Sequence, residues 1–590
     1  MIRLCENLTM FELFFIYKLA FSGQACIFLS LLSYILAIFQ SSKKYQYSFI
    51  LLSVCVLWVS YFVLTIAFVI SDFSLKVVVE NTSVYTPILY KIVGVWGASS
   101  GSFHLWICIL SLAGIFLQSR KAQQLFALHM VGFLLFQFIV NPPFETVVGF
   151  VHMGDLNPLL QDKSMVLHPP ILYTGYLIFS YIFFAANESI ERLKCAYKAG
   201  FFILTLGIGL GSYWAYYELG WGGFWYWDPV EVISLIPWML YLLGFHLLKN
   251  ESNTKVLRYL SIGAWPLVLV CFALVRSGVL SSVHSFASAP SFLMNFFVLF
   301  LCTVLPVIFF NWKYLRENNT SPDRSNALYT IKIIPLIICL GMLFILLLSI
   351  LIPIFITDVY FGPNFFKATV WPLILPILAL MSILPFRAYS FERMIPGFLG
   401  AGIVLFFAID CGQFSYLSLL SFCLCAFGMF VSVYNFICDK RFSKKYGSML
   451  CGHLGWYALI GSCILTTDLG YEESFILTEK NRQCTLPTGV QLTLQNLQPK
   501  TGANYTGHEA SIDVQEKGRA VYALTPEIHY FTTTHTTHSR MNINSYFLSQ
   551  SAIAMESVNA HTLKGMYYNR PYIQGVWLSV GVILLALIFG

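Results

Sequence analysis

The sequence predicts a mainly α-helical, polytopic membrane protein: a transmembrane helical bundle of about fifteen spans with a small β-rich external domain. Three observations predict this fold class. Of 590 residues, 57% are hydrophobic and 11% are charged, with a mean hydropathy of +0.71, whereas a soluble chain carries about a quarter charged residues. The apolar residues gather in runs long enough to cross a bilayer. A single long polar stretch interrupts them near the C-terminus.

The apolar runs predict about fifteen spans, because a helix needs about 20 mainly apolar residues to cross a bilayer. They make 1–467 a transmembrane region and 573–590 a C-terminal transmembrane helix. The spans are expected near 19–39, 48–70, 103–118, 124–141, 171–187, 199–217, 231–248, 258–275, 291–311, 330–356, 369–386, 393–410, 414–437, 450–467 and 573–590.

The loops between these spans differ in charge. One alternate set holds most of the loop Lys and Arg residues, and cytoplasmic loops concentrate these cations. That set is therefore predicted to be cytoplasmic, which places the N-terminus outside and the C-terminus inside. The formal charge of +7 then reflects topology and gives no reason to expect a nucleic-acid partner. The short loops of the other set hold only Lys76, Lys91, Lys163, Arg276 and Lys367.

The polar region 468–572 is predicted to form the external β-rich domain. It is rich in Thr, Asn and Tyr, and stretches such as 491–495 alternate polar and apolar residues, which is typical of strands. Its single cysteine, Cys484, excludes a disulfide scaffold. The predicted topology places this domain outside, between the last two spans.

The composition of the spans argues against two classes of membrane protein. Proton pumps and ion-coupled transporters need ionisable residues within the membrane, and these spans hold almost none; Asp410 lies at an outer end. The chain also contains no C-x-x-C pair, which argues against a thiol–disulfide oxidoreductase. The polar groups in or near the spans are mainly His, Tyr and Trp, a pattern that suits an apolar planar cofactor.

A tryptophan-rich external loop follows the sixth span, over residues 211–231, and is called the tryptophan segment below. Its core reads Trp221-Gly-Gly-Phe-Trp-Tyr-Trp-Asp-Pro-Val-Glu231. An aromatic belt at the membrane interface is the alternative, but a belt scatters its aromatic residues over many helix ends. Here they are packed together with Gly222 and Gly223, and glycine permits close backbone approach. We therefore interpret the segment as a ligand platform.

This core closely resembles the WWD signature of membrane haem-handling proteins. Further stretches stand around it in a fixed order, and together they look like the cytochrome c maturation protein F family, the haem lyase subunit of a multi-component maturation system. These stretches are D-L-N-P-L-L-Q-D from Asp155, L-H-P-P-I-L-Y from Leu167, R-S-G-V-L-S-S-V-H-S-F-A from Arg276, G-H-L-G from Gly452 and Y-N-R-P-Y-I from Tyr568.

The chain departs from the family pattern at three places, one of which is 232–233, where Val-Ile replaces the usual Asn-Ala. The family usually has W-G-G-H-E-G-S after the second span, where this chain has W-G-A-S-S-G-S at 96–102. Loss of the His-Glu pair weakens any role assigned to that loop. The second aromatic residue of the WWD core is Phe224 instead of Trp, which keeps the aromatic character.

The resemblance implies an external haem in transit, held at the tryptophan segment. It implies His168 and His284 as axial ligands of the haem iron, and both lie on the predicted outer side; a satisfied interfacial histidine is the alternative for each. Arg276 would provide a cation for a haem propionate, or snorkel at the interface. The platform residues implied are Trp221, Gly222, Gly223, Trp225, Trp227 and Asp228.

His246 and His453 form a second candidate pair near the inner side. His246 lies roughly 22 Å below the outer surface at about 1.5 Å per helical residue. His453 lies near the cytoplasmic start of another span. The family carries a b-type haem on these positions, so the resemblance implies a transmembrane b-type haem here. His129, also toward the inner end of its span, is expected to be a core residue.

Two polar groups have structural interpretations. Asp228 and Glu231 are expected to orient the loop or to cap the seventh span, which begins at Pro229. The pair His535 and His538 superficially suggests a metal site, but we interpret it as part of a Thr-rich surface strand.

The resemblance implies a haem lyase that attaches haem covalently, through thioethers, to apocytochrome c. The expected partners are apocytochrome c with a C-x-x-C-H motif, a periplasmic haem carrier, other maturation subunits and quinol as the electron source for the inner haem. A haem transfer or export subunit without covalent chemistry is the nearest alternative, and a transporter or respiratory subunit is the alternative from another class. The expected location is the bacterial or mitochondrial inner membrane, with the tryptophan segment and the domain 468–572 outside.

Overall fold

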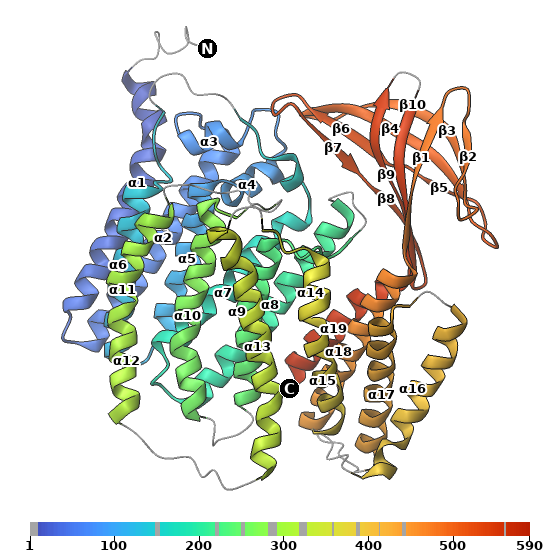
Figure 1. The fold of residues 1–590 in the computed structure, drawn as a ribbon. Coiled ribbons are helices and arrows are strands. Elements are labelled where there is room, and N and C mark those ends of the chain that lie inside the picture. The colour runs from blue at the N-terminus through green and yellow to red at the C-terminus, as the bar shows by residue number, and fades with distance from the viewer. Residues whose placement is uncertain are drawn as a thin grey trace. The chain divides into compact units, whose positions relative to one another are not determined.

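The computed structural model describes residues 10–147, 154–218, 223–248, 254–280, 282, 292–317, 327–356, 359–384, 390–411, 414–438, 444–559 and 562–590 (Figure 1). The chain divides into two compact units, which are described separately. The N-terminal unit comprises Met1–Gly207, Asp228–Asp323 and Ile350–Thr357. The C-terminal unit comprises Ile208–Trp227, Arg324–Ser349 and Asp358–Gly590.

The N-terminal unit is a bundle of helices around an aromatic core. The ring of Trp106 stacks on Trp265 and Phe272, with centroids 5.7 and 4.5 Å apart, and each such pair adds about 1 kcal/mol beyond its buried area. Its helices are α1 (Met10–Phe39), α2 (Lys43–Ile70), α3 (Lys76–Asn81), α4 (Ile88–Gly97), α5 (Ser99–Phe116), α6 (Arg120–Val140), α7 (His168–Phe184), the first part of α8 (Ile190–Glu218), α9 (Pro229–Leu247), α10 (Thr254–Ser277), α11 (Phe292–Thr303) and α12 (Leu305–Glu317).

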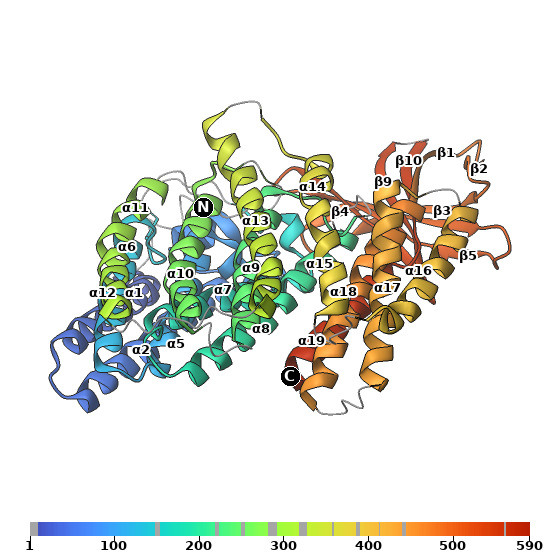
Figure 2. The same cartoon turned by 60° about the horizontal axis from the view of Figure 1, so that its bottom comes forward.

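The C-terminal unit contains the end of α8, further helices and every strand found among the described residues. Helices α17, α18 and α19 lie side by side, as both views show (Figure 2). Its helices are most of α13 (Ala327–Phe355), α14 (Pro363–Thr369), α15 (Trp371–Ile383), α16 (Phe391–Cys411), α17 (Tyr416–Cys438), α18 (Lys444–Leu469) and α19 (Ile573–Phe589).

The strands form two antiparallel sheets with a shared apolar core. One sheet has the order β1-β10-β9-β8, and the other has the order β2-β3-β4-β6-β7, with β5 paired to β4. Leu492 and Leu494 are buried on β3 and alternate with polar residues, as a half-buried strand requires. The strands are β1 (Tyr471–Thr478), β2 (Gln483–Thr485), β3 (Gln491–Thr501), β4 (Tyr505–Gln515), β5 (Tyr522–Leu524), β6 (Glu527–Phe531), β7 (Thr536–Arg540), β8 (Asn542–Tyr546), β9 (Ser549–Asn559) and β10 (Thr562–Arg570).

The predicted fold class is confirmed. Among the described residues, 13 helices are long and apolar enough to cross a membrane, or 14 if one bent pair counts as a single span. Helix α19 is shorter, at 17 residues, and matches the last predicted span. Every segment predicted to span the membrane contains a helix.

Three local features differ from the prediction. Helix α4 was not predicted, because its ten residues are too few for a span and include Lys91. The span predicted at 291–311 consists of α11 and α12. The span predicted at 369–386 is part of a bent pair, α14 and α15, with an angle of 46° between them. Pro372, at the start of α15, has no amide proton and interrupts the hydrogen bonding between these two helices.

Candidate functional site

The tryptophan segment begins on a helix and ends on a helix. Residues 211–218 are the last turns of α8, and residues 223–228 form an irregular stretch that leads into α9. Trp221 and Gly222 lie outside the described residues. Up to Trp227 the segment belongs to the C-terminal unit, and from Asp228 onward it belongs to the N-terminal unit. The WWD motif is therefore divided between the two units.

Asp228 and Glu231 form a capping box at the start of α9, so the predicted cap is confirmed. The Asp228 carboxylate accepts the amide of Val230 at 2.9 Å, and the Glu231 carboxylate accepts the amide of Asp228 at 3.1 Å. Such a box satisfies amides that a helix start leaves without partners. The Ser282 hydroxyl also donates to Asp228 at 2.6 Å. Asp228 thereby holds the chain two residues before His284, which itself lies outside the described residues.

Trp227 adopts a backbone conformation that is rare for an aromatic residue. Its φ is +58°, in the left-handed region, where a bulky side chain is a genuine outlier. Its ring stacks on Phe366 of α14, with centroids 4.4 Å apart and planes 10° apart. Trp225 meets the same indole edge to face at 6.0 Å. The two tryptophans and Phe366 thus make one continuous aromatic group within the C-terminal unit.

The last helix, α19, packs against the other part of the segment. The ring of Trp577 lies 6.3 Å from Phe224 and 5.3 Å from Tyr213, both in edge-to-face geometry. Gly223 allows the Tyr226 ring to approach the backbone, since a Cβ there would lie 2.3 Å from that ring. Phe224 stands where the family pattern has tryptophan, and its ring contacts Trp577 of α19 within the C-terminal unit.

His168 is the first residue of α7, with Pro169 and Pro170 in the first turn. Its Nδ1 lies 2.8 Å from the carbonyl oxygen of Gly207 on α8. A carbonyl can only accept, so Nδ1 carries the proton and Nε2 is the basic nitrogen of the ring. Metal-binding histidines usually have this arrangement, because a bonded Nδ1–H fixes both the tautomer and the ring orientation.

The stretch from Asp155 to Gln161 supports the approach to His168. Asp155 is buried and accepts the Thr86 hydroxyl at 2.6 Å. The Gln161 side chain donates to the Leu156 carbonyl at 3.0 Å, which closes the stretch on itself. Trp96 then donates its indole N–H to the carbonyl of Met165 at 3.0 Å, three residues before His168. The contacts made by this motif are thus structural.

Arg276 is buried at the end of α10 and binds the start of α5. Its guanidinium donates to the hydroxyl of Ser102 at 2.7 Å and to the carbonyl of Ser99 at 2.8 Å. Its charge also lies 5.5 Å from the centre of the Phe272 ring, a favourable cation–π distance. Tyr173 of α7 interacts with both Arg276 and Ser102. Arg276 therefore contacts the loop where the chain departs from the family pattern.

His246 and His453 belong to different units, so their pairing stays a prediction. His246 is exposed near the end of α9, and its Nδ1 donates to the carbonyl of Leu242 at 2.8 Å. His453 is half-buried on α18. His129 is buried in the N-terminal unit, and both its ring nitrogens have partners, Thr303 at 3.1 Å and the indole of Trp265 at 3.3 Å. These bonds are those of a core residue.

Comparison with known proteins shows the family of this chain. Residues 96–281 match the cytochrome C assembly protein family, and residues 473–569 match the CcmF C-terminal beta-sandwich. The cytochrome c-type biogenesis protein CcmF of Pseudomonas aeruginosa is 30% identical over 576 residues, which cover 88% of this chain and 86% of that protein. The chain belongs to the CcmF family of cytochrome c-type biogenesis proteins.

Other relatives cover the chain equally well. The Escherichia coli K12 protein CcmF is 28% identical over 586 residues, covering 90% of this chain and 88% of that protein. A solved structure, described as cytochrome c heme lyase CcmF, covers 97% of both chains with a TM-score of 0.78 and 17% identity. At 17% identity, this match shows that the two chains share a fold.

Sequence reasoning missed two sets of contacts to the tryptophan segment. Phe366 of α14 and Trp577 of α19 touch it, although both are remote in the sequence. His538 lies on β7, as the strand interpretation has it, but its partner is Glu218 at the end of α8. His535 has a separate partner, the Tyr530 hydroxyl at 3.1 Å. No local pattern in the sequence pairs these residues.

Proposed function

We propose that this CcmF-family chain is the haem lyase component of a cytochrome c maturation system. It binds haem at the tryptophan segment, with His168 and His284 as axial ligands, and promotes thioether attachment of that haem to apocytochrome c. One observation carries the proposal: the Nδ1–H of His168 is bonded to the Gly207 carbonyl, which makes Nε2 the nitrogen that can bind iron.

The residues of the chain fit an external haem. Trp225, Trp227 and Phe224 offer apolar rings that suit a large planar ligand. Arg276 supplies the positive charge that a propionate needs. The capping box at Asp228 and its bond to Ser282 brace the chain next to His284. The proposal gives platform roles to Trp221, Gly222, Gly223, Trp225, Trp227 and Asp228, as the family resemblance implies.

His246 and His453 are proposed as the ligands of a second, b-type haem within the membrane. The support from the structure is again a tautomer, because the Nδ1–H of His246 is bonded to the Leu242 carbonyl and Nε2 is therefore basic. Quinol is the proposed electron donor to this haem, which keeps the iron of the external haem ferrous.

When bound, the external haem supplies two vinyl groups, and each takes up one cysteine S–H, with sulfur bonding to one vinyl carbon and hydrogen to the other. The chain itself binds, orients and shields these reactants, which lowers the barrier through proximity. The proposed partners are apocytochrome c with a C-x-x-C-H motif, a periplasmic haem carrier and other maturation subunits. The proposed location is the bacterial or mitochondrial inner membrane, with the N-terminus and the tryptophan segment outside.

The test is to purify the intact protein and record absorption spectra with and without dithionite, for wild type and for four variants. His168→Ala and His284→Ala should remove the spectrum of the external haem, whereas His246→Ala and His453→Ala should remove that of the b-type haem. His535→Ala is the matched control, because His535 is exposed in a turn of the β domain. A wild-type protein that carries no haem contradicts the proposal.

A second measurement separates a lyase from a haem transfer subunit. A co-expressed apocytochrome c should retain haem after denaturation in detergent if the chain promotes covalent attachment. Haem that binds to the chain but never becomes covalent on the cytochrome would favour a transfer or export subunit. His168→Ala should abolish the covalent product without lowering the amount of apocytochrome c.

A further inference from the structure

Within the tryptophan segment, the part up to Trp227 belongs to the C-terminal unit, which also holds it. Residues Ile208–Trp227 group with the C-terminal helices and the β domain, and the division from the N-terminal unit falls directly after Trp227. We call the residues from Glu218, the last residue of α8, to Trp227 the WWD loop. Each of its two end residues contacts another part of the C-terminal unit.

Glu218 places a carboxylate at the C-terminal end of α8, where the helix itself destabilises a negative charge. The C-terminal end of a helix carries partial negative charge, so an acidic side chain there is repelled. The Glu218 side chain is only 3% exposed, and a buried carboxylate is costly unless it is paired. The reason for a glutamate at this position must therefore lie outside α8.

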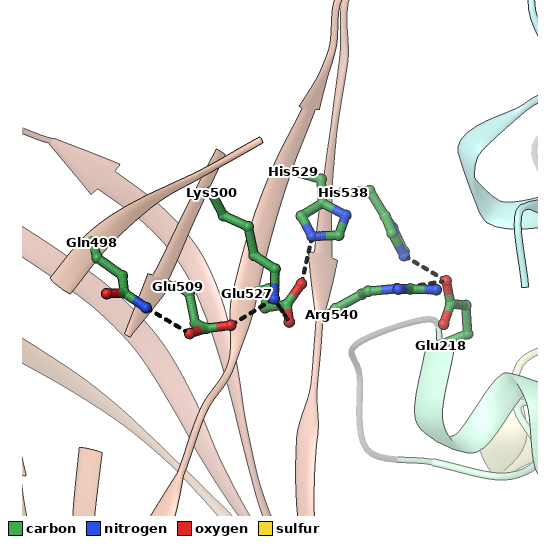
Figure 3. Close-up of polar contacts among 8 residues, drawn as sticks. All are labelled: Glu218, Gln498, Lys500, Glu509, Glu527, His529, His538 and Arg540. Atoms are coloured by element: carbon green, nitrogen blue, oxygen red, sulfur yellow. Dashed lines mark hydrogen bonds and ion pairs between the residues drawn. The ribbon is translucent and has the colours of Figure 1, made fainter. Parts of the chain in front are cut away.

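The partners of Glu218 come from strand β7 of the β domain. The Nε2 of His538 lies 3.0 Å from its carboxylate, and the Nε of Arg540 lies 3.8 Å from the same oxygen (Figure 3). His538 and Arg540 are two residues apart on one strand, so both side chains leave the same face. This face of β7 thus binds the start of the WWD loop.

The position of β7 is braced by a polar network that runs across the sheet. His529 of β6 stands directly opposite His538 in the strand register and is bonded to Glu527 at 2.7 Å. Glu527 then pairs with Lys500 at 2.5 Å, and Lys500 pairs with Glu509 at 2.6 Å (Figure 3). The strand that holds Glu218 is therefore tied to three further strands.

The end of the WWD loop is held by a ring stack. A residue in the left-handed region costs roughly 1–2 kcal/mol when it is not glycine, so the conformation of Trp227 needs support from its surroundings. Phe366 supplies a parallel stack at 4.4 Å and is itself only 1% exposed. The indole direction is thus set by α14, a helix far from the WWD motif in the sequence.

We propose that Glu218, His538, Arg540 and Phe366 are positioning residues for haem. They hold the two ends of the WWD loop on the C-terminal unit and so set the distance and tilt of the aromatic platform. The inference rests on the proposed haem-binding function, and it gives the β domain a role in that function: β7 is the support against which the start of the loop is fixed.

The first test measures haem affinity and midpoint potential on the intact protein, using Glu218→Gln, His538→Gln and the double variant. We expect each single variant to lower haem affinity about tenfold and to shift the midpoint potential. The double variant should lose no more than Glu218→Gln alone, because that single change already removes the carboxylate that His538 contacts. Glu556→Gln, at an exposed position on β9, is the matched control.

The second test concerns the stack. Phe366→Leu should lower haem affinity by a similar factor, because leucine has no ring to stack on Trp227. Phe366→Trp keeps a ring and should retain the wild-type affinity. Phe547→Leu is the control, since Phe547 is 90% exposed in the turn between β8 and β9.

A third measurement needs no haem. In the haem-free protein, Glu218→Gln should increase amide hydrogen exchange over 211–230 but leave exchange over 471–515 unchanged, which also shows that the variant is folded. If the variants melt at a lower temperature yet keep wild-type affinity, potential and exchange, the contacts are structural only and the inference is wrong. A wild-type protein without haem would overturn the proposed function itself. If His168→Ala loses haem but the Glu218, His538 and Phe366 variants bind it as the wild type does, only the inference is overturned.

Discussion

At the scale of single residues, two of the proposed iron ligands make the same kind of hydrogen bond, from Nδ1 to a backbone carbonyl. His168 bonds through Nδ1 to a carbonyl of a neighbouring helix, whereas His246 bonds to a carbonyl of its own helix. Both bonds select the tautomer with a basic Nε2. A sequence motif can identify such histidines, but it does not show their hydrogen-bond partners. His168 reaches the Gly207 carbonyl because α7 and α8 pack closely there: a Cβ at Gly207 would lie 3.1 Å from the backbone of Leu172.

Arg276 leads to a prediction at this scale. Its planar guanidinium binds the Ser102 hydroxyl and the Ser99 carbonyl at once, which a lysine cannot reproduce. Arg276→Lys should lower the free energy of unfolding by about 1.5–3 kcal/mol, the range for a hydrogen bond to a charged group. Thermal melting of the detergent-solubilised protein measures this effect. Arg482→Lys, the same change at an exposed site, should leave the melting temperature unchanged, and an equal loss in both variants would contradict the prediction.

At the scale of elements, strands β4 and β6 carry like charges directly opposite each other. Glu509 and Glu527 are register partners, and two carboxylates in that position repel. Lys500 of β3 lies between them and pairs with both. These hydrogen bonds lower the pKa of Glu509 and raise the pKa of Lys500 to about 12. Lys500 of β3 thus offsets the repulsion between the carboxylates of β4 and β6.

The charges of these strands lead to a pH-dependent prediction. Because the pKa of Glu509 is lower in the folded state, its pairing stabilises the fold above the pKa of the unfolded chain, about 4.3, and this stabilisation is lost as the pH falls through the folded pKa. Lys500→Met should therefore destabilise the β domain at pH 7, by no more than about 1 kcal/mol because the pair is partly exposed. The difference should shrink below about pH 4.

Hydrogen exchange over 505–531, corrected for its intrinsic pH dependence, measures this difference between wild type and Lys500→Met. Lys480→Met replaces an exposed lysine outside this network and is the control. A Lys500→Met effect that stays constant from pH 7 to acid conditions would show that the lysine acts through packing and not through charge.

At the scale of the whole molecule, the chain is organised so that one motif belongs to two units. The WWD residues up to Trp227 pack with the C-terminal helices and the β domain, whereas Asp228 caps a helix of the N-terminal unit. The cytochrome C assembly match spans this division at 96–281, and the β-sandwich match covers a separate part of the chain. Residues remote in sequence therefore support the WWD loop.

The orientation of the chain in the membrane is also predicted at the scale of the whole molecule, because it depends on the charges of all loops together. The distribution of Lys and Arg places the β domain outside and the loop at Lys43 and Lys44 inside. In spheroplasts of an expressing bacterium, a membrane-impermeant maleimide should label Arg482→Cys, and it should label Lys44→Cys only after lysis. Wild-type protein gives the background from native thiols. The opposite labelling pattern would contradict the predicted topology.

The sequence alone determined the helical spans, the β-rich domain, the cap at Asp228 and the resemblance to the CcmF family. These properties are local: the length of an apolar run, its alternation and the order of motifs can be read residue by residue. Only the tertiary structure decided that Phe366 stacks on Trp227, that Glu218 pairs with β7 and that Arg276 binds the start of α5. Each of these contacts joins residues far apart in the chain, and the packing of whole helices and strands brings them together.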